Sequence, residues 1–278
     1  MPGACRCKGV ECVLSIMSKL KFTIAECKKT DGAFAAFVAN LPQRFAAEGH
    51  LLHDQRNTIK AFNLNGQPVV VKRFRRLSLF QRIVYSFFRQ NKAVRAYNNA
   101  FELQRRGVST PSALAFAEVW GGGLLQQVYY VSAANYWQPL QAGFDVGADH
   151  GFSNSLAVAF AGFVAGLHKA GIVHRDLNST NVLWQEGEGG QYCFALIDIN
   201  RITFYPQGQV PPPGVCFENL TLFTGNMALF KVVAQAYAVA MGGNVEQMVP
   251  AMLAQKQRHD AVWQRRKRIL GKLKQLFR

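Results

Sequence analysis

The sequence lacks a long hydrophobic run and is poor in acidic residues. The longest apolar stretch, residues 156–167, covers about a dozen residues, whereas a helix that crosses a bilayer needs about 20. We therefore predict no transmembrane span. The 16 Asp and Glu are outnumbered by 32 Lys and Arg, which gives a formal net charge of +16. This excess indicates a positive field that attracts phosphates, nucleic acid or an anionic membrane.

Cysteine pairs with metal-ligand spacing are also missing, which argues against a zinc site and favours reduced thiols. The six cysteines are Cys5, Cys7, Cys12, Cys27, Cys193 and Cys216. The N-terminus lacks the layout of a secretory signal, so we expect a cytoplasmic protein. Residues 1–16 are interpreted as a disordered leader or a misassigned start before Met17.

What the chain does have is the composition of a folded protein, with 49% hydrophobic and 17% charged residues. Residues 17–131 are predicted to form an N-terminal lobe of antiparallel sheet plus one helix over residues 79–106. The Asn-Gly pair at 65–66 and the three glycines at 121–123 are turn signals between strands. The strands are expected near residues 56–62, 68–74, 113–119 and 124–131.

Residues 132–278 are predicted to form a second, mainly helical lobe. A largely buried helix is expected over residues 155–169 and ends at Gly171. Short strands then flank a polar loop, and helices resume from about residue 228.

The polar loop carries the strongest chemical signal. It reads His-Arg-Asp-Leu-Asn-Ser-Thr-Asn from His174 to Asn181, and Asp198 follows 17 residues later at a strand end. This spacing is typical of the catalytic loop and metal-binding aspartate of kinases. Asp176 is the candidate acceptor of a hydroxyl proton, while Asn181 and Asp198 offer oxygen ligands for a Mg²⁺ ion bridging the phosphates of ATP. The alternative is an ordinary Asp/Asn-rich turn. His174 is expected to hold the loop backbone and not to transfer a proton, and Arg175 either binds an anion in the following segment or has a surface or backbone-bracing role.

Three further residues are candidates for nucleotide binding. Lys72 ends a hydrophobic strand and matches the lysine that contacts the α and β phosphates; a solvated edge lysine is the alternative. Glu102 is predicted to pair with Lys72, against the alternative of an exposed glutamate beside Arg105 or Arg106. Gly49 is the single glycine of a thin phosphate loop that we place in residues 48–55.

At these residues the chain resembles the protein-kinase-like superfamily and, within it, the bacterial lipopolysaccharide core kinases, which phosphorylate Kdo or heptose of the inner core. The resemblance covers about residues 45–235. Besides the loop and Asp198, it is carried by Arg56-Asn57, Val70-Val71-Lys72-Arg73-Phe74, residues 103–111 (Leu-Gln-Arg-Arg-Gly-Val-Ser-Thr-Pro) and Ile197-Asp198-Ile199-Asn200-Arg201. It implies a two-lobed α+β fold, ATP and Mg²⁺ as cofactors, and Kdo-lipid A, a lipopolysaccharide precursor, as acceptor. It also implies a peripheral location on the cytoplasmic face of the inner membrane.

Asn178 stands where protein kinases usually have lysine, which argues against a protein kinase, and Ile199-Asn200 replaces Phe-Gly after Asp198, a change that resembles the lipopolysaccharide kinases. A protein or small-molecule kinase of the same fold is one alternative. The single glycine of the phosphate loop and the late position of Glu102 in its helix leave a membrane-binding pseudokinase scaffold as another. The choice between Kdo and heptose, and the oligomeric state, do not follow from the sequence.

Basic residues gather in two blocks. Residues 55–101 hold ten Lys and Arg and no acidic residue, and residues 256–278 hold nine against Asp260. In the second block Trp263, Leu270, Leu273 and Phe277 recur at helical spacing, which predicts an amphipathic basic helix on an anionic membrane surface. The alternative is that this apolar stripe packs on the second lobe. No motif that reads nucleic acid accompanies the charge, so we expect no nucleic-acid partner.

Overall fold

The computed structural model describes the backbone of residues 18–144 and 152–276, with side chains as far as residue 271. The chain forms two compact units. The first contains the chain up to Arg105 together with Pro111–Asn135, and the second contains Arg106–Thr110 and the chain from Tyr136 onward. The predicted leader over residues 1–16 lies outside the described residues.

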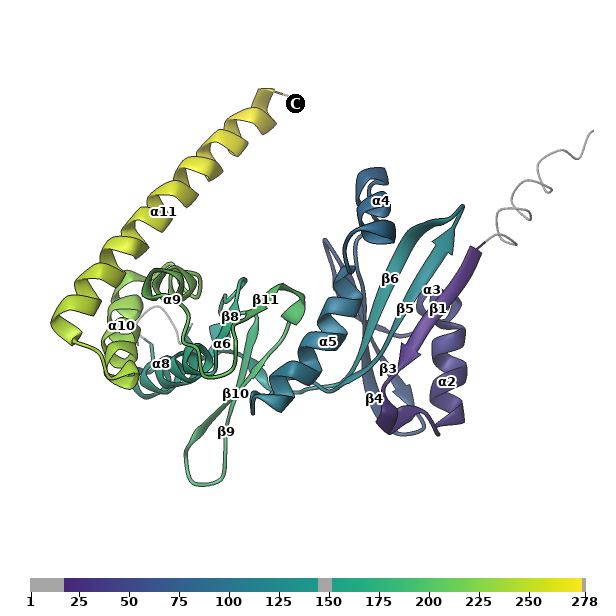
Figure 1. Cartoon of the computed structure of the whole chain (residues 1–278), viewed down its shortest axis with the longest axis horizontal. Coiled ribbons are helices and arrows are strands. Elements are labelled where there is room, and N and C mark those ends of the chain that lie inside the picture. Colours follow the sequence, from purple (N-terminus) through teal and green to yellow (C-terminus); the bar gives the residue numbers. More distant parts are fainter. Residues whose placement is uncertain (1–17, 145–151, 277–278) are drawn as a thin grey trace, which may run out of the picture. The chain divides into compact units, whose positions relative to one another are not determined.

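The first unit is built on a six-stranded antiparallel sheet with the order β1-β5-β6-β4-β3-β2 (Figure 1). The predicted hairpin is confirmed as β3 and β4, and its turn places Asn65 and Gly66 at φ values of 52° and 82°. The left-handed conformation at both positions is what a tight hairpin turn requires. The strands are β1 (Ser18–Ile24), β2 (His50–Asp54), β3 (Thr58–Leu64), β4 (Gln67–Arg73), β5 (Ala113–Gly121) and β6 (Leu124–Ala133).

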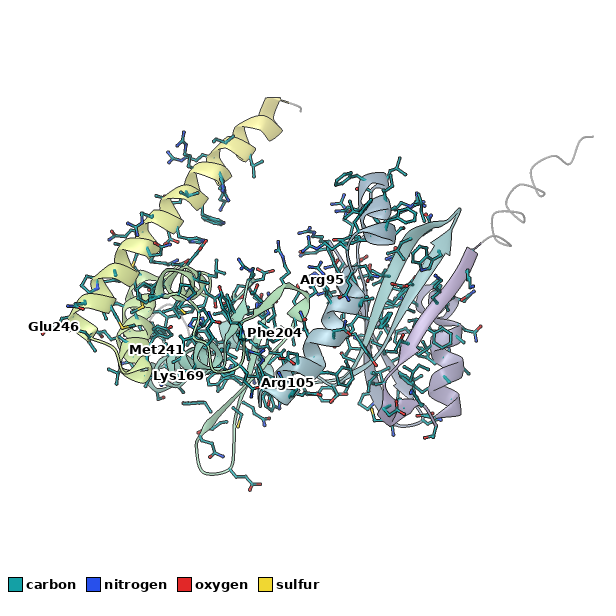
Figure 2. The ribbon with its side chains drawn as sticks, viewed as in Figure 1. Arg95, Arg105, Lys169, Phe204, Met241 and Glu246 are labelled. Atoms are coloured by element: carbon teal, nitrogen blue, oxygen red, sulfur yellow. The ribbon has the colours of Figure 1, made fainter. Side chains whose placement is uncertain are left out.

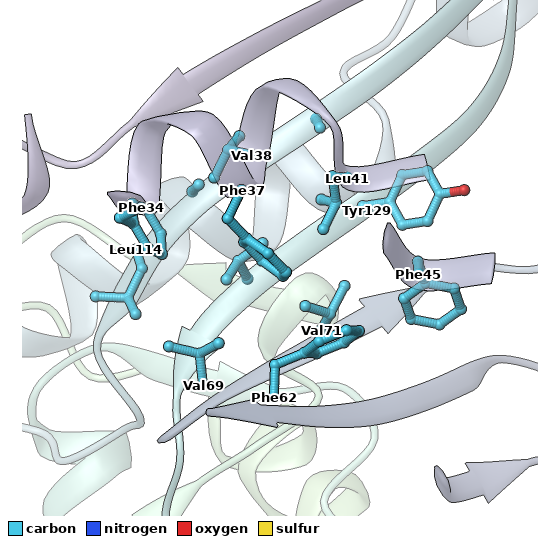
Figure 3. Packing of buried hydrophobic residues seen from close by; sticks show 13 residues of the cluster. Phe34, Phe37, Val38, Leu41, Phe45, Phe62, Val69, Val71, Leu114 and Tyr129 are labelled. Atoms are coloured by element: carbon cyan, nitrogen blue, oxygen red, sulfur yellow. The ribbon is translucent and has the colours of Figure 1, made fainter. Parts of the chain in front are cut away.

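One face of this sheet is covered by α2 (Gly32–Ala39) and α3 (Leu41–Ala47), which follow the short 3-10 turn η1 (Glu26–Lys28). Side chains alternate along a strand, so Val69 and Val71 of β4 point to the same face. Figure 3 shows them packed with phenylalanines of the two helices and of β3. The aromatic members of this core are Phe34, Phe37, Phe45, Phe62 and Tyr129.

The opposite face is covered by α5 (Lys92–Arg105). Lys72 and Phe116 both lie opposite Tyr130 in the sheet, so the three side chains share this face. Tyr97 of α5 packs edge-on against Phe116 with ring centroids 5.1 Å apart. Lys72 therefore lies on the α5 side of the sheet.

The prediction of one helix over residues 79–106 is wrong, because the segment forms two helices, α4 (Leu79–Phe87) and α5. Asn91 is buried between them, and its Oδ1 accepts hydrogen bonds from the backbone N–H groups of Ala93 (2.9 Å) and Val94 (3.2 Å). Its Nδ2 donates to Glu118 on β5. These bonds cap the first turn of a new helix that begins at Lys92, so the helix breaks here although the apolar spacing in the sequence continues.

The second unit is mainly helical. Its core packs α8 against α10, with the Phe160 and Phe223 rings 5.1 Å apart and Phe230 stacked on Phe223. The helices are α6 (Leu140–Phe144), α8 (Asn154–Lys169), the short 3-10 helix η2 (Ile199–Arg201), α9 (Pro213–Leu220), α10 (Met227–Met241) and α11 (Val245–Leu276). The strands form two small antiparallel sheets from β7 (Gln138–Pro139), β8 (Ile172–His174), β9 (Val182–Glu186), β10 (Tyr192–Leu196) and β11 (Ile202–Phe204).

The long helix α11 is held at its N-terminal half and extends away from α8 and α10, as Figure 2 shows from the labelled Glu246 onward. Lys256 is buried, and its Nζ donates to Asp260 Oδ1 (2.7 Å) and to the carbonyl of Thr221 (3.2 Å). Every side chain of residues 261–271 is exposed. Across the described residues, none of the helices combines the length and the hydropathy that a membrane crossing demands.

Candidate active site

The polar loop lies in the second unit between β8 and β9, and the side chain of His174 hydrogen-bonds to its backbone. The buried imidazole donates from Nε2 to the carbonyl of Ile197 (3.0 Å) and accepts the N–H of Asp176 at Nδ1 (3.2 Å). Burial lowers the pKa of His174, so the ring is neutral. A neutral ring is required here, because a protonated Nδ1 could not accept the Asp176 N–H.

Asn178 closes the loop. Its Oδ1 accepts hydrogen bonds from the backbone N–H groups of Thr180 (3.0 Å) and Asn181 (3.1 Å). The side chain of Asn181 donates from Nδ2 to the carbonyl of Asp176 (2.9 Å). This bond fixes the amide so that its other end, the oxygen that can bind a cation, points away from the loop backbone.

The carboxylate of Asp176 is partly exposed. Oδ1 accepts a hydrogen bond from Asn178 Nδ2 (3.3 Å), and Oδ2 lies 3.8 Å from Nη1 of Arg201. Because 38% of its side-chain surface is exposed, this carboxylate can receive a proton from a bound hydroxyl.

Asp198 adopts the left-handed conformation, with φ 53° and ψ 42°. Asp adopts this conformation more readily than most residues other than glycine, for which it costs about 1–2 kcal/mol. The segment is joined to the loop, because the N–H of Ile197 donates to the Asn181 carbonyl (3.0 Å). Asn200 Nδ2 donates to Asp198 Oδ1 (2.5 Å) and orients the carboxylate. The backbone of Asn181 thus lies next to the segment that carries Asp198, and the role of the two side chains as metal ligands stays a prediction.

A buried chain of hydrogen bonds ties the loop to three helices. Asn219 of α9 donates from Nδ2 to the His174 carbonyl (2.7 Å), and its Oδ1 accepts from His168 Nε2 of α8 (3.0 Å). His168 Nδ1 accepts the hydroxyl of Tyr237 on α10 (2.7 Å). Burial lowers the pKa of His168 and raises that of Tyr237, so both groups are neutral. No motif of the catalytic loop contains these three residues, and sequence analysis missed them.

Arg175 has a bracing role. Its N–H donates to the carbonyl of Arg201 (2.9 Å), and its Nε donates to the hydroxyl of Thr203 (2.7 Å). These contacts join the loop to the antiparallel pair β8–β11.

The three candidate nucleotide residues lie in the first unit and are not all brought together. Lys72 pairs with Ile59, near the β2–β3 turn at residues 55–57, on the α5 face of the sheet. Gly49 lies just before the N-terminal end of β2, whereas the β2–β3 turn follows its C-terminal end. Gly49 packs on Phe62, which belongs to the α2–α3 face. A Cβ on Gly49 would lie 2.6 Å from Phe62 Cζ.

Glu102 lies on α5, the helix that covers the face carrying Lys72. Its two carboxylate oxygens accept hydrogen bonds from Arg105 Nη2 (2.7 Å) and Nε (2.8 Å). Glu102 thus makes the contact with Arg105 that the sequence offers as the alternative to pairing with Lys72. Pairing with Lys72 stays a prediction.

The oxygen atoms of Asn181 and Asp198 form a donor set that fits magnesium. Mg²⁺ is usually held by one or two carboxylates with substrate phosphates and waters completing the coordination. Within the described part of the chain, no group of three or more His, Cys, Asp and Glu side chains forms a self-sufficient metal site. A hard cation that brings phosphate ligands with it matches this pair of residues better than a structural zinc ion does.

A hollow of about 310 Å³ adjoins the loop within the second unit. Ser179 of the loop reaches its wall, and the Ser179 carbonyl accepts the N–H of Gln141 from α6 (3.1 Å). The wall combines polar side chains with two phenylalanines, namely Gln141, Ser179, Thr224 and Asn226 with Phe144 and Phe223. Polar groups beside aromatic rings suit a hydroxyl-rich ligand.

An antiparallel sheet unit followed by a helical unit with this loop defines a phosphotransferase of the protein-kinase-like fold. The chain belongs to the lipopolysaccharide kinase (Kdo/WaaP) family, whose model matches residues 60–204, just over half of its length. It is thus a kinase that transfers a phosphoryl group to an alcohol.

The fold is also seen in a solved structure described as WaaP in complex with acyl carrier protein. That structure is 15% identical in sequence, with a TM-score of 0.59, and the match covers 86% of this chain and 97% of the other. No curated protein matches the sequence.

Proposed function

We propose that this kinase transfers the γ-phosphoryl group of ATP to a sugar hydroxyl, of Kdo or heptose, in the lipopolysaccharide inner core. The observation that carries the proposal is the loop geometry. Asp176 is hydrogen-bonded but partly exposed, its carbonyl accepts from Asn181, and the Asn181 carbonyl accepts the N–H of Ile197, which precedes Asp198. Family membership supports the class of acceptor and makes a scaffold without activity the weaker alternative.

In the proposed reaction the acceptor oxygen attacks the γ-phosphorus, a new O–P bond forms, and the bond between the γ-phosphorus and the β–γ bridging oxygen breaks to release ADP. Asp176 orients the hydroxyl and takes its proton. Asn181 and Asp198 would hold a magnesium ion, which would supply charge neutralisation on the phosphates. Lys72 binds the α and β phosphates. The roles of Glu102 as its partner and of Gly49 in the phosphate loop stay predictions.

We place the acceptor in the hollow beside Ser179. The hollow is lined by polar side chains, and Ser179 of the loop that carries Asp176 forms part of its wall. The phenylalanine rings offer an apolar surface on which the C–H face of a sugar can stack.

The second partner that we propose is an anionic membrane surface, contacted by the distal half of α11. Trp263 and Leu270 are 56% and 60% exposed, so the alternative in which these residues pack on the second lobe does not hold for them. Residues 265–268 are all basic, and each cation near an anionic leaflet contributes about 1 kcal/mol. The other two residues of the predicted stripe, Leu273 and Phe277, have no described side chains.

The deciding experiment measures transfer of labelled γ-phosphate from Mg-ATP to purified Kdo-lipid A, with an Asp176→Asn variant of equal thermal stability as control. We expect the unchanged chain to transfer phosphate to Kdo-lipid A and the variant to lose this activity. Transfer to heptosylated lipid A alone would identify heptose as the acceptor. Transfer only to proteins or aminoglycosides would overturn the proposed acceptor while leaving the kinase class intact.

A further inference from the structure

Helix α4 presents its apolar residues to solvent. Five large apolar side chains on and just after this helix are between 40% and 79% exposed, namely Leu79, Phe80, Ile83, Phe87 and Phe88. None of its residues is buried. The helix is thus amphipathic in the opposite sense from a normal surface helix, whose apolar stripe faces the core.

The helix is firmly placed by its other side. Ser78 caps it in a capping box with Gln81, so that both ends of the first turn are hydrogen-bonded. Ser86 Oγ accepts the N–H of Leu125 on β6 (2.9 Å) and donates to the carbonyl of Arg82 (2.6 Å). The exposed apolar face is therefore a fixed surface on the first unit and not a frayed segment; Figure 1 shows α4 at one end of the sheet, beside β6.

The sequence that flanks α4 carries charge of one sign. Arg75 and Arg76 before the helix and Arg89 after it are exposed, and no acidic residue occurs between residues 55 and 101. Cations that flank a cluster of exposed phenylalanines complement a surface that is anionic on the outside and apolar beneath. A second copy of the chain is a poor match, because it would bring the same cations to the contact.

We infer that α4 is a membrane-insertion element, whose phenylalanines enter an anionic phospholipid bilayer while the flanking arginines bind the headgroups. This goes beyond the proposed contact of α11 with the membrane, since α4 belongs to the other unit and its exposed apolar residues are mainly phenylalanines. Insertion of α4 would give the first unit its own attachment to the surface that holds a lipid-anchored acceptor.

Flotation with phosphatidylcholine vesicles that contain about one third phosphatidylglycerol tests the inference. We expect the variant Phe80→Ser/Phe87→Ser/Phe88→Ser to bind at least about tenfold more weakly than the unchanged chain. The control Val158→Ser/Val239→Ser changes two exposed residues of α8 and α10 and should bind normally. Because all five positions are exposed, thermal stability should be similar in each protein.

A second measurement reports insertion directly. In Phe87→Trp, the added tryptophan should be quenched by vesicles with brominated acyl chains, beyond the quenching of the unchanged chain. Equal flotation of the triple variant, or no added quenching, would overturn the inference. Loss of binding only when residues 263–278 are removed would overturn it while leaving the α11 proposal intact. Binding to neutral vesicles with the same affinity, or association of α4 with a second copy or an acidic protein in place of lipid, would also overturn it.

Discussion

Asn219 donates a hydrogen bond of 2.7 Å from its side-chain amide to the backbone carbonyl of His174. The same side chain accepts from His168, so one buried residue of α9 holds the catalytic loop to α8. The position of Asp176, two residues beyond His174, depends on this contact.

We expect Asn219→Leu to lose stability and turnover together. The change leaves the His174 carbonyl and His168 Nε2 buried without a partner, at about 1–3 kcal/mol each. Urea denaturation should show this loss, and kcat should fall with little change in the KM for ATP. Asn154→Ala, at an exposed position of α8, is the control. A stable Asn219→Leu enzyme with normal kcat would contradict the role of the contact.

Two substitutions of Asp198 should separate its charge from its backbone conformation. Asn tolerates the left-handed conformation and can still accept from Asn200, so Asp198→Asn should fold normally but lose about a hundredfold or more in activity. Asp198→Ala should also lose about 1 kcal/mol of stability. Thermal denaturation and phosphate transfer, measured on both, give the comparison. Full activity in Asp198→Asn would exclude a metal-binding carboxylate there.

Stability should fall as the pH drops below about 6.5. Burial lowers the pKa of His168 and His174 in the folded chain, whereas both side chains have ordinary pKa values when unfolded. At pH values between the folded and the unfolded pKa, the unfolded state therefore binds more protons, and the free energy of unfolding decreases as the pH falls through that window.

The variant His168→Gln removes one of these groups, so its free energy of unfolding should depend less steeply on pH. Urea denaturation between about pH 7.5 and pH 5 measures the slope. His53→Gln, at an exposed position of β2, should keep the original slope. An unchanged slope in His168→Gln would show that His168 does not titrate as its burial implies.

Gly49→Ala should destabilise the first unit more than Gly66→Ala does. Both glycines have positive φ, but a Cβ on Gly66 meets nothing within 4 Å, whereas one on Gly49 meets the Phe62 ring. We expect a loss of about 1–3 kcal/mol for Gly49→Ala, partly recovered by Phe62→Leu. Equal effects of the two alanine substitutions would contradict the packing role. A raised KM for ATP without loss of stability would instead favour the predicted nucleotide role.

Gln141→Ala should raise the KM for the acceptor several-fold and leave the KM for ATP unchanged, because Gln141 lines the hollow beside Ser179. Gln257→Ala, on the exposed side of α11, is the matched control. Unchanged acceptor kinetics would place the sugar elsewhere.

The local parts of this molecule could be predicted from the sequence. The β3–β4 hairpin follows from Asn65-Gly66, and a polar loop between two short strands follows from residues 174–181, whose hydrogen bonds are largely internal. The contribution of Asn219 could not be predicted, because it acts from 45 residues away.

The non-local parts were missed. Strand β1 is fixed by pairing with β5, almost a hundred residues later, and α2 is too short for its apolar pattern to identify it. Gly49 shows the same limit, because a side chain at this position would collide with the ring of Phe62 on the neighbouring strand β3. Sequence analysis treated that glycine as part of a phosphate loop.

The segment Arg106–Thr110 belongs to the second unit although its neighbours on both sides belong to the first. Arg106 donates to the carbonyls of Ala170 (2.7 Å) and Tyr205 (3.0 Å), and Thr110 donates to the carbonyl of Leu196 (2.8 Å). The polypeptide therefore crosses between the lobes three times. A single cut after Asn135 would not yield two self-contained halves, because the N-terminal fragment would keep five residues that complete the C-terminal one. Truncation at that point would separate the Arg106 and Thr110 donors from the three carbonyls of the second unit that they bind.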